Sequence, residues 1–124
     1  MAGLQNDSKI HVYGYTRDIP LLMSSADLYV SKPGGLSTTE AATKKLPMML
    51  LNVVGGCETY NLNFFRALGA AKEAHTAKDA AILCNTLISD ETLLPQMEAA
   101  FRESFRRNSA ELIYNTILQI TENI

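Results

Sequence analysis

Residues 27–41 have the sequence DLYVSKPGGLSTTEA, and the order of residue types in this stretch indicates a strand, a sharp turn and a helix. The segment from Asp27 to Ser31 is typical of a short strand, and the Lys-Pro-Gly-Gly that follows it is a strong loop signal. The residues from Leu36 to Lys45 then have the composition of a helix. The stretch therefore predicts one strand–turn–helix unit of an α/β protein.

Further strand and helix patterns lie on both sides of this unit. Residues 47–54 form a nearly continuous apolar run, as expected of a strand buried on both faces, and residues 70–74 indicate an edge strand. The β-rich residues 11–15 indicate one more strand. Helices are expected at residues 19–26 and 58–68, and again after residue 76. We therefore predict a single partial domain over residues 1–124, with an α/β, Rossmann-like, mostly parallel sheet of about four strands, flanking helices and a helical C-terminus.

Local signals mark several helix ends. Gly69 is expected to end the helix at 58–68, because glycine is the usual residue at such ends. Thr76 and Asp79 have the spacing of a capping box, and Asn108 is a candidate cap for the last helix. That helix carries an isoleucine stripe, which predicts one apolar face.

The composition excludes several classes of protein. The chain has 124 residues, of which 47% are hydrophobic and 19% charged, and a net charge of −2. These values are typical of a globular domain, and they offer no basic field for nucleic acid. No signal peptide or membrane-spanning run is present, so we expect a cytoplasmic location, including the cytoplasmic face of the membrane. The two cysteines and two histidines predict neither a disulfide scaffold nor a metal site.

The glycine turn after Ser31 is the first candidate site. Parallel sheets bind ligands beyond the carboxyl ends of their strands, and free N–H groups at a helix start attract phosphate. Gly34 and Gly35 allow a phosphate to approach the backbone, Ser37 to Thr39 add hydroxyl donors, and Glu40 could accept bonds from ribose hydroxyls. The alternative is a structural strand-to-helix turn in which Glu40 is an ordinary first-turn charge.

Two other segments are candidates for the same site. The turn at residues 55–61 again joins a strand to a helix, and it places Glu58 and Asn61 on one helix face, where they could bind sugar hydroxyls. Tyr15, at the end of the first expected strand, could stack on a base. The alternatives are a helix start with solvated polar residues and a tyrosine at the rim of the core.

Considered together, these segments resemble the C-terminal half of a GT-B glycosyltransferase family. The family contains monogalactosyldiacylglycerol synthases, processive diacylglycerol glucosyltransferases and the peptidoglycan lipid II glucosaminyltransferase. The resemblance covers residues 11–71, with its motifs in family order, and the glycolipid branch is the closer match. The motifs are Gly14-Tyr15, Ala26-Asp27-Leu28, Ser31 to Ser37, Thr39-Glu40-Ala41, Leu46-Pro47, Gly56-Cys57-Glu58, Asn61, Phe64-Phe65 and Gly69-Ala70-Ala71.

The resemblance implies inverting transfer of a hexose from a UDP-sugar to a lipid such as diacylglycerol, with no cofactor and no tightly bound metal. It assigns Tyr15 and Thr16 to the uracil pocket and Glu40 to the ribose. It assigns Glu58 and Asn61 to the donor sugar. The diphosphate-binding turn is Gly34, Gly35, Leu36 and Ser37. No catalytic residue is implied in this chain, because the family's general base and acceptor site belong to the N-terminal domain. Cys57 stands where the family usually has Gln, which leaves the identity of the sugar open.

The resemblance also implies that the chain is a fragment, inactive by itself. The family's C-terminal domain has strand order 3-2-1-4-5-6, and this chain begins just before the third strand. The strand at 11–15 would then pair directly with the strand at 27–31, or two copies would form a homodimer through the exposed strand edge. The missing N-terminal domain, or a partner chain that carries it, is the other expected partner.

Two rival functions stay open from the sequence. One is a peptidoglycan-type N-acetylglucosaminyltransferase fragment, and the other is a non-catalytic nucleotide-binding or interaction module of a split enzyme. Residues 101–107, with the sequence FRESFRR, likewise have two interpretations. They would contact anionic lipid, or the phenylalanines would face the core and the arginines solvent.

Overall fold

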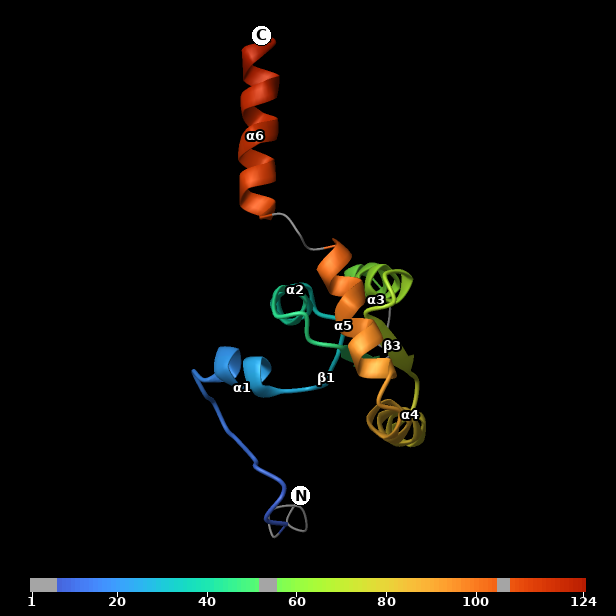
Figure 1. The fold of residues 1–124 in the computed structure, drawn as a ribbon. Coiled ribbons are helices and arrows are strands. Elements are labelled where there is room, and N and C mark those ends of the chain that lie inside the picture. Colours follow the sequence, from blue (N-terminus) through green and yellow to red (C-terminus); the bar gives the residue numbers. More distant parts are fainter. Residues whose placement is uncertain (1–6, 52–55, 105–107) are drawn as a thin grey trace.

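The computed structural model of the chain describes residues 7–51, 56–104 and 108–124. Strands alternate with helices along the first part of the described chain, and helices follow (Figure 1). The elements are α1 (Ile19–Ser25), β1 (Tyr29–Ser31), α2 (Gly35–Thr43), β2 (Met48–Leu51), α3 (Cys57–Ala67), β3 (Ala71–Ala74), α4 (Ala77–Ser89), α5 (Leu93–Ser104) and α6 (Ser109–Glu122). The α/β fold with a parallel sheet, flanking helices and a helical C-terminus is therefore confirmed, and it is consistent with a partial Rossmann-like GT-B C-terminal domain.

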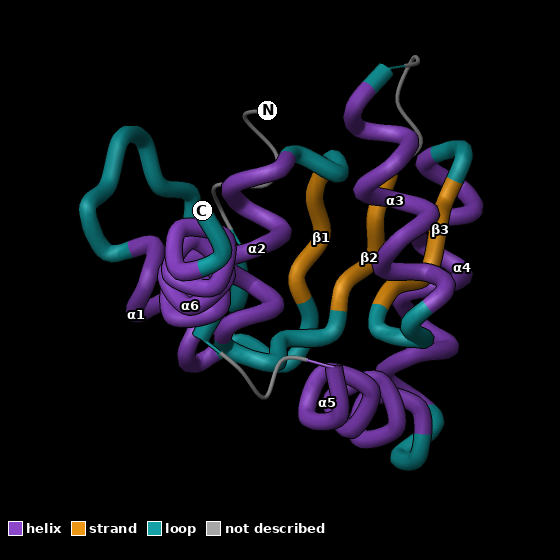
Figure 2. The backbone as a smooth tube through the Cα atoms, turned by 90° about the horizontal axis from the view of Figure 1, so that it is seen from above, coloured by secondary structure: helices purple, strands orange, loops and turns teal. Residues whose placement is uncertain are grey.

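The sheet of the described residues has three parallel strands in the order β1-β2-β3. Met48 of the central strand is opposite Tyr29 on one side and Ala71 on the other. Helices α2 and α3 cover one face, α4 lies on the opposite face, and α5 lies beside the amino ends of the strands (Figures 1 and 2). Because both faces are covered, β2 is apolar along its length, with Met48 and Leu50 fully buried.

Aromatic contacts connect α3 and α5 in the core. Phe65 of α3 and Phe101 of α5 are both buried, and their ring centroids are 6.2 Å apart. Met23 of α1 and Leu62 of α3 belong to the same cluster. Phe101 therefore faces the core, and Arg102 beside it is exposed and forms an ion pair with Glu98. The last three residues of the FRESFRR motif, 105–107, lie outside the described residues.

The prediction of a strand at residues 11–15 is wrong. This segment forms no strand, and its side chains are exposed, with Val12 63% and Tyr15 93% accessible. It has the residue types of a strand, but a strand also needs a partner edge, and it does not pair with β1. The sheet therefore has three strands in the described chain rather than about four. The proposed direct pairing of 11–15 with β1 fails for the same reason, whereas pairing of two copies stays a prediction.

Helix α6 extends away from the sheet (Figure 1) and has no buried residue. The Asn108 side chain accepts a hydrogen bond from the Ala110 N–H, so the predicted cap is confirmed. Ile113, Ile117 and Ile120 of the predicted stripe are each more than half exposed. Among the helices of the described residues, none has the length and apolar character needed to cross a membrane.

Candidate functional site

The glycine turn, residues 32–35, connects the carboxyl end of β1 to the start of α2. The Gly34 N–H donates to the Lys32 carbonyl at 2.9 Å, which closes the turn. Helix α2 begins at Gly35, and the Thr38 N–H donates to the Gly34 carbonyl at 3.1 Å. The N–H groups of Gly35, Leu36 and Ser37 precede this first intrahelical bond, so they have no acceptor within the helix. The turn therefore places these N–H groups at the positive end of the helix dipole, where they can attract an anion, and phosphate binding there stays a prediction.

The hydroxyl groups of α2 stabilise the turn itself. Thr38 is buried, and its Oγ1 donates to the Gly34 carbonyl at 2.6 Å. Thr39 Oγ1 donates to the Gly35 carbonyl at 2.7 Å, and Ser37 Oγ is 3.5 Å from the Gly34 carbonyl. The expectation that Thr38 and Thr39 donate their hydroxyl groups to a ligand is therefore wrong, because both hydroxyl groups donate inside the helix. The partly buried Ser37 makes the longest of these contacts.

The start of α3 contacts the glycine turn. Asn61 Nδ2 donates to the Pro33 carbonyl at 3.0 Å, and Lys32 Nζ is 3.2 Å from Glu58 Oε1. The starts of α2 and α3 thus lie at the same edge of the sheet, as the parallel strand order predicts (Figure 2). Lys32 is a functional candidate that the sequence reasoning missed. Its position directly before Pro-Gly-Gly, as a cation beside an expected phosphate site, was the available signal.

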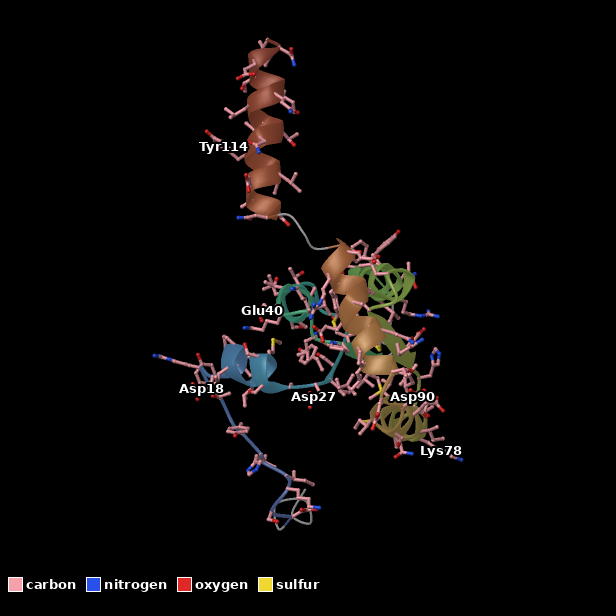
Figure 3. All side chains as sticks on the ribbon, viewed as in Figure 1. Asp18, Asp27, Glu40, Lys78, Asp90 and Tyr114 are labelled. Carbon is pink, nitrogen blue, oxygen red and sulfur yellow. The ribbon has the colours of Figure 1, made fainter. Side chains whose placement is uncertain are left out.

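Glu40 and Leu36 lie on the exposed side of α2. They are four residues apart, so they share one face of the helix, and Leu36 is 86% accessible. Figure 3 shows Glu40 on the side of α2 that faces away from α5. An exposed carboxylate one turn into a helix whose first N–H groups lack intrahelical acceptors can accept hydrogen bonds from a ligand hydroxyl.

Tyr15 and Thr16 lie in a different place. They belong to the segment before α1, which Figures 1 and 2 show apart from the start of α2. Thr16 makes its hydrogen bonds within that segment, where its Oγ1 accepts from the Asp18 N–H at 3.1 Å and donates to Asp18 Oδ2 at 3.3 Å. The structure brings together the glycine turn, Glu58 and Asn61, but Tyr15 and Thr16 lie apart from this group. Their role in a uracil pocket stays a prediction.

The described part of the chain also contains an exposed thiol and a cavity outside the glycine turn. Cys57 is a free thiol, exposed at the start of α3. No group of three or more His, Cys, Asp or Glu side chains in the described part of the chain is placed to hold a metal ion. A cavity of about 850 Å³ lies between α1, the end of α2, α4 and α5, and its lining includes Asp27, Lys44 and Leu94 but no residue of the glycine turn. This cavity is therefore separate from the candidate site at the carboxyl edge of the sheet.

No protein-family model matches the chain. Individual curated proteins do, and several are processive diacylglycerol beta-glucosyltransferases. The one from Bacillus subtilis (strain 168) is 33% identical over 118 residues, which cover 95% of this chain and 31% of the relative. The one from Bacillus thuringiensis (strain Al Hakam) is 31% identical over 121 residues, or 96% of this chain and 31% of the relative. The one from Staphylococcus carnosus (strain TM300) is 36% identical over 90 residues, which cover 73% of this chain and 23% of the relative.

These relatives are considerably longer than the chain. The match includes almost all of this sequence but only 31% of the Bacillus subtilis protein, so about two thirds of that protein has no counterpart here. Over almost its whole length, the chain is thus homologous to part of the processive diacylglycerol beta-glucosyltransferases, which are glycosyltransferases by name.

Proposed function

We propose that this chain is the donor-binding portion of an inverting glycosyltransferase that transfers a hexose from a UDP-sugar to a lipid acceptor such as diacylglycerol. The observation that carries the proposal is the glycine turn at the start of α2, to which two side chains of α3 are joined. The names of the relatives support a glycolipid-forming enzyme over the peptidoglycan-type alternative.

In this proposal the diphosphate binds at the start of α2. The backbone N–H groups of Gly35, Leu36 and Ser37 donate to its oxygens, and Gly34 and Gly35 permit the close approach. The helix dipole then stabilises the negative charge that develops on UDP as it leaves, which lowers the barrier to transfer. Glu40 accepts hydrogen bonds from the ribose hydroxyls.

The remaining assignments follow the family resemblance. Tyr15 and Thr16 would line the uracil pocket, and Glu58 would contact the donor sugar. The general base and the acceptor site are supplied by the rest of the enzyme, so the chain by itself binds donor but transfers nothing. The assembled enzyme would act at the cytoplasmic face of the membrane, where its lipid acceptor is located.

Calorimetric titration with UDP tests the proposal. The wild-type chain is expected to bind UDP saturably, and Glu40→Ala is expected to weaken binding at least about tenfold, because a hydrogen bond to a charged group contributes about 1.5–3 kcal/mol. Glu103→Ala, which removes an exposed carboxylate from α5, is the matched control and should bind as the wild type does. Equal affinity in all three proteins would rule out the ribose role of Glu40, and a folded wild-type chain that does not bind UDP would contradict the proposed function.

A further inference from the structure

We infer that Asn61 is a positioning residue that fixes the glycine turn, rather than a ligand of the donor sugar. The effect that we predict on donor binding rests on the proposed function. Its structural basis is the hydrogen bond from Asn61 Nδ2 to the Pro33 carbonyl, 3.0 Å long, which joins groups 28 residues apart in the sequence.

This bond holds a single peptide group whose orientation sets the direction of the turn. The carbonyl of the Pro33–Gly34 peptide accepts from Asn61, and the N–H of the same peptide donates to the Lys32 carbonyl at 2.9 Å. Both polar atoms of the peptide are therefore bonded. Because a peptide group is planar, fixing both atoms fixes the direction in which the chain enters Gly35 and α2.

The contact surface around Asn61 supports this role. Asn61 is partly buried, and a Cβ atom placed on Gly35 would lie 3.7 Å from Asn61 Nδ2, so the amide is seated directly against the turn. One helical turn earlier, Glu58 forms its ion pair with Lys32 at 3.2 Å. Side chains one turn apart on α3 thus hold both sides of Pro33. One of the two amide N–H groups of Asn61 is thus bound to the protein backbone, which holds the amide against the turn.

The consequence is a specific pattern of binding losses. If Asn61 fixes the turn, its loss disorders the backbone that receives the diphosphate, and UDP and UDP-glucose lose affinity by the same factor. If Asn61 instead binds the sugar, only UDP-glucose loses affinity. A neutral hydrogen bond of this kind contributes enough to predict a loss of about three- to tenfold for both ligands.

The experiment compares the wild-type chain, Asn61→Ala and the matched control Asn63→Ala, which removes an exposed asparagine from the same helix. Calorimetry with UDP and with UDP-glucose gives the two affinities. Backbone ¹⁵N relaxation of the ligand-free proteins gives the order parameters of Gly34 and Gly35. We expect about 0.85 in the wild type and in Asn63→Ala, and a fall toward about 0.6 in Asn61→Ala, with equal losses of affinity for both ligands.

Each other outcome is decisive. Unchanged order parameters in Asn61→Ala, or a loss confined to UDP-glucose, would overturn the inference. If the wild type binds neither ligand while the order parameters fall as expected, the proposed function fails and the positioning of the turn by Asn61 stands. If Asn61→Ala does not fold, Asn61→Asp keeps the shape but replaces the donor with an oxygen, and the same fall in order parameters is expected there.

Discussion

Asp90, in the connection between α4 and α5, illustrates how one side chain organises a helix start. Its Oδ1 accepts hydrogen bonds from Thr92 Oγ1 at 2.7 Å and from the Thr92 N–H at 2.9 Å; Figure 3 labels the position of Asp90. These bonds favour the charged carboxylate, so they hold the pKa of Asp90 below its ordinary value. The bond from the Thr92 side chain has the larger effect and the bond from the Thr92 backbone the smaller one. The lowered pKa means that Asp90 contributes stability above its unfolded-state pKa, and that this contribution is lost as the pH falls through its folded-state pKa.

An NMR titration of the Asp90 carboxyl group tests this assignment. The midpoint in the wild-type chain should lie below the ordinary value for aspartate. Thr92→Ala removes the hydroxyl donor but keeps the backbone donor, so the midpoint should rise without reaching the ordinary value. Thr86→Ala is the control, because it removes a hydroxyl that donates to the Ile82 carbonyl within α4 and keeps the Thr86 carbonyl, which accepts from the Asp90 N–H. An Asp90 midpoint that stays in place or falls in Thr92→Ala would contradict the assignment.

Among the elements, α3 is followed by Gly69, whose left-handed backbone conformation favours glycine. Gly69 has φ of +79°, and its N–H donates to the Arg66 carbonyl at 2.9 Å. Gly69→Ala is therefore expected to lower the free energy of unfolding by about 1–2 kcal/mol, which is the cost of a left-handed conformation for a residue with a Cβ atom. Urea unfolding measures the change. Gly14→Ala is the control, because no atom lies within 4 Å of a Cβ built at Gly14 and its φ is not positive; equal effects of the two substitutions would argue against backbone strain at Gly69.

The elements that the sequence predicted correctly are those whose signals are local. The Asp79 N–H donates to Thr76 Oγ1 at 3.0 Å, so the predicted cap of α4 is confirmed, as is the end of α3 at Gly69. The strand expected at residues 11–15 was wrong because a strand depends on a partner, which a local pattern of β-rich residues does not supply. Residues 71–74 have weaker strand character, yet they form β3 because β2 lies beside them.

The same distinction applies to the candidate site. The sequence predicted that the glycine turn and the start of α3 lie at one edge of the sheet, because parallel strands place their carboxyl ends together. It did not predict that Asn61 binds the Pro33 carbonyl or that Lys32 pairs with Glu58. Those contacts depend on how α3 packs against the turn. The spacing of residues along one helix does not determine this tertiary packing.

At the scale of the whole molecule, the stability is concentrated in the core and not in α6. Phe101 is fully buried against Phe65, whereas Ile117 of α6 is 53% accessible. Phe101→Ala is expected to cost about 3–5 kcal/mol because it leaves a cavity, and Ile117→Ala should change stability by about 0.5 kcal/mol or less. Urea unfolding of both variants measures the difference. A cost for Ile117→Ala comparable to that of Phe101→Ala would show that α6 is buried in solution.

The glycine turn at the start of α2 is proposed to bind a nucleoside diphosphate. A ¹H–¹⁵N NMR titration of the wild-type chain with UDP tests this proposal, because the amide signals report the place of binding as well as its strength. We expect saturable shifts of the Gly34, Gly35, Leu36 and Ser37 amides, while the amides of α6 stay in place. Saturable shifts that omit the glycine turn, or no saturable shift at millimolar UDP, would contradict it.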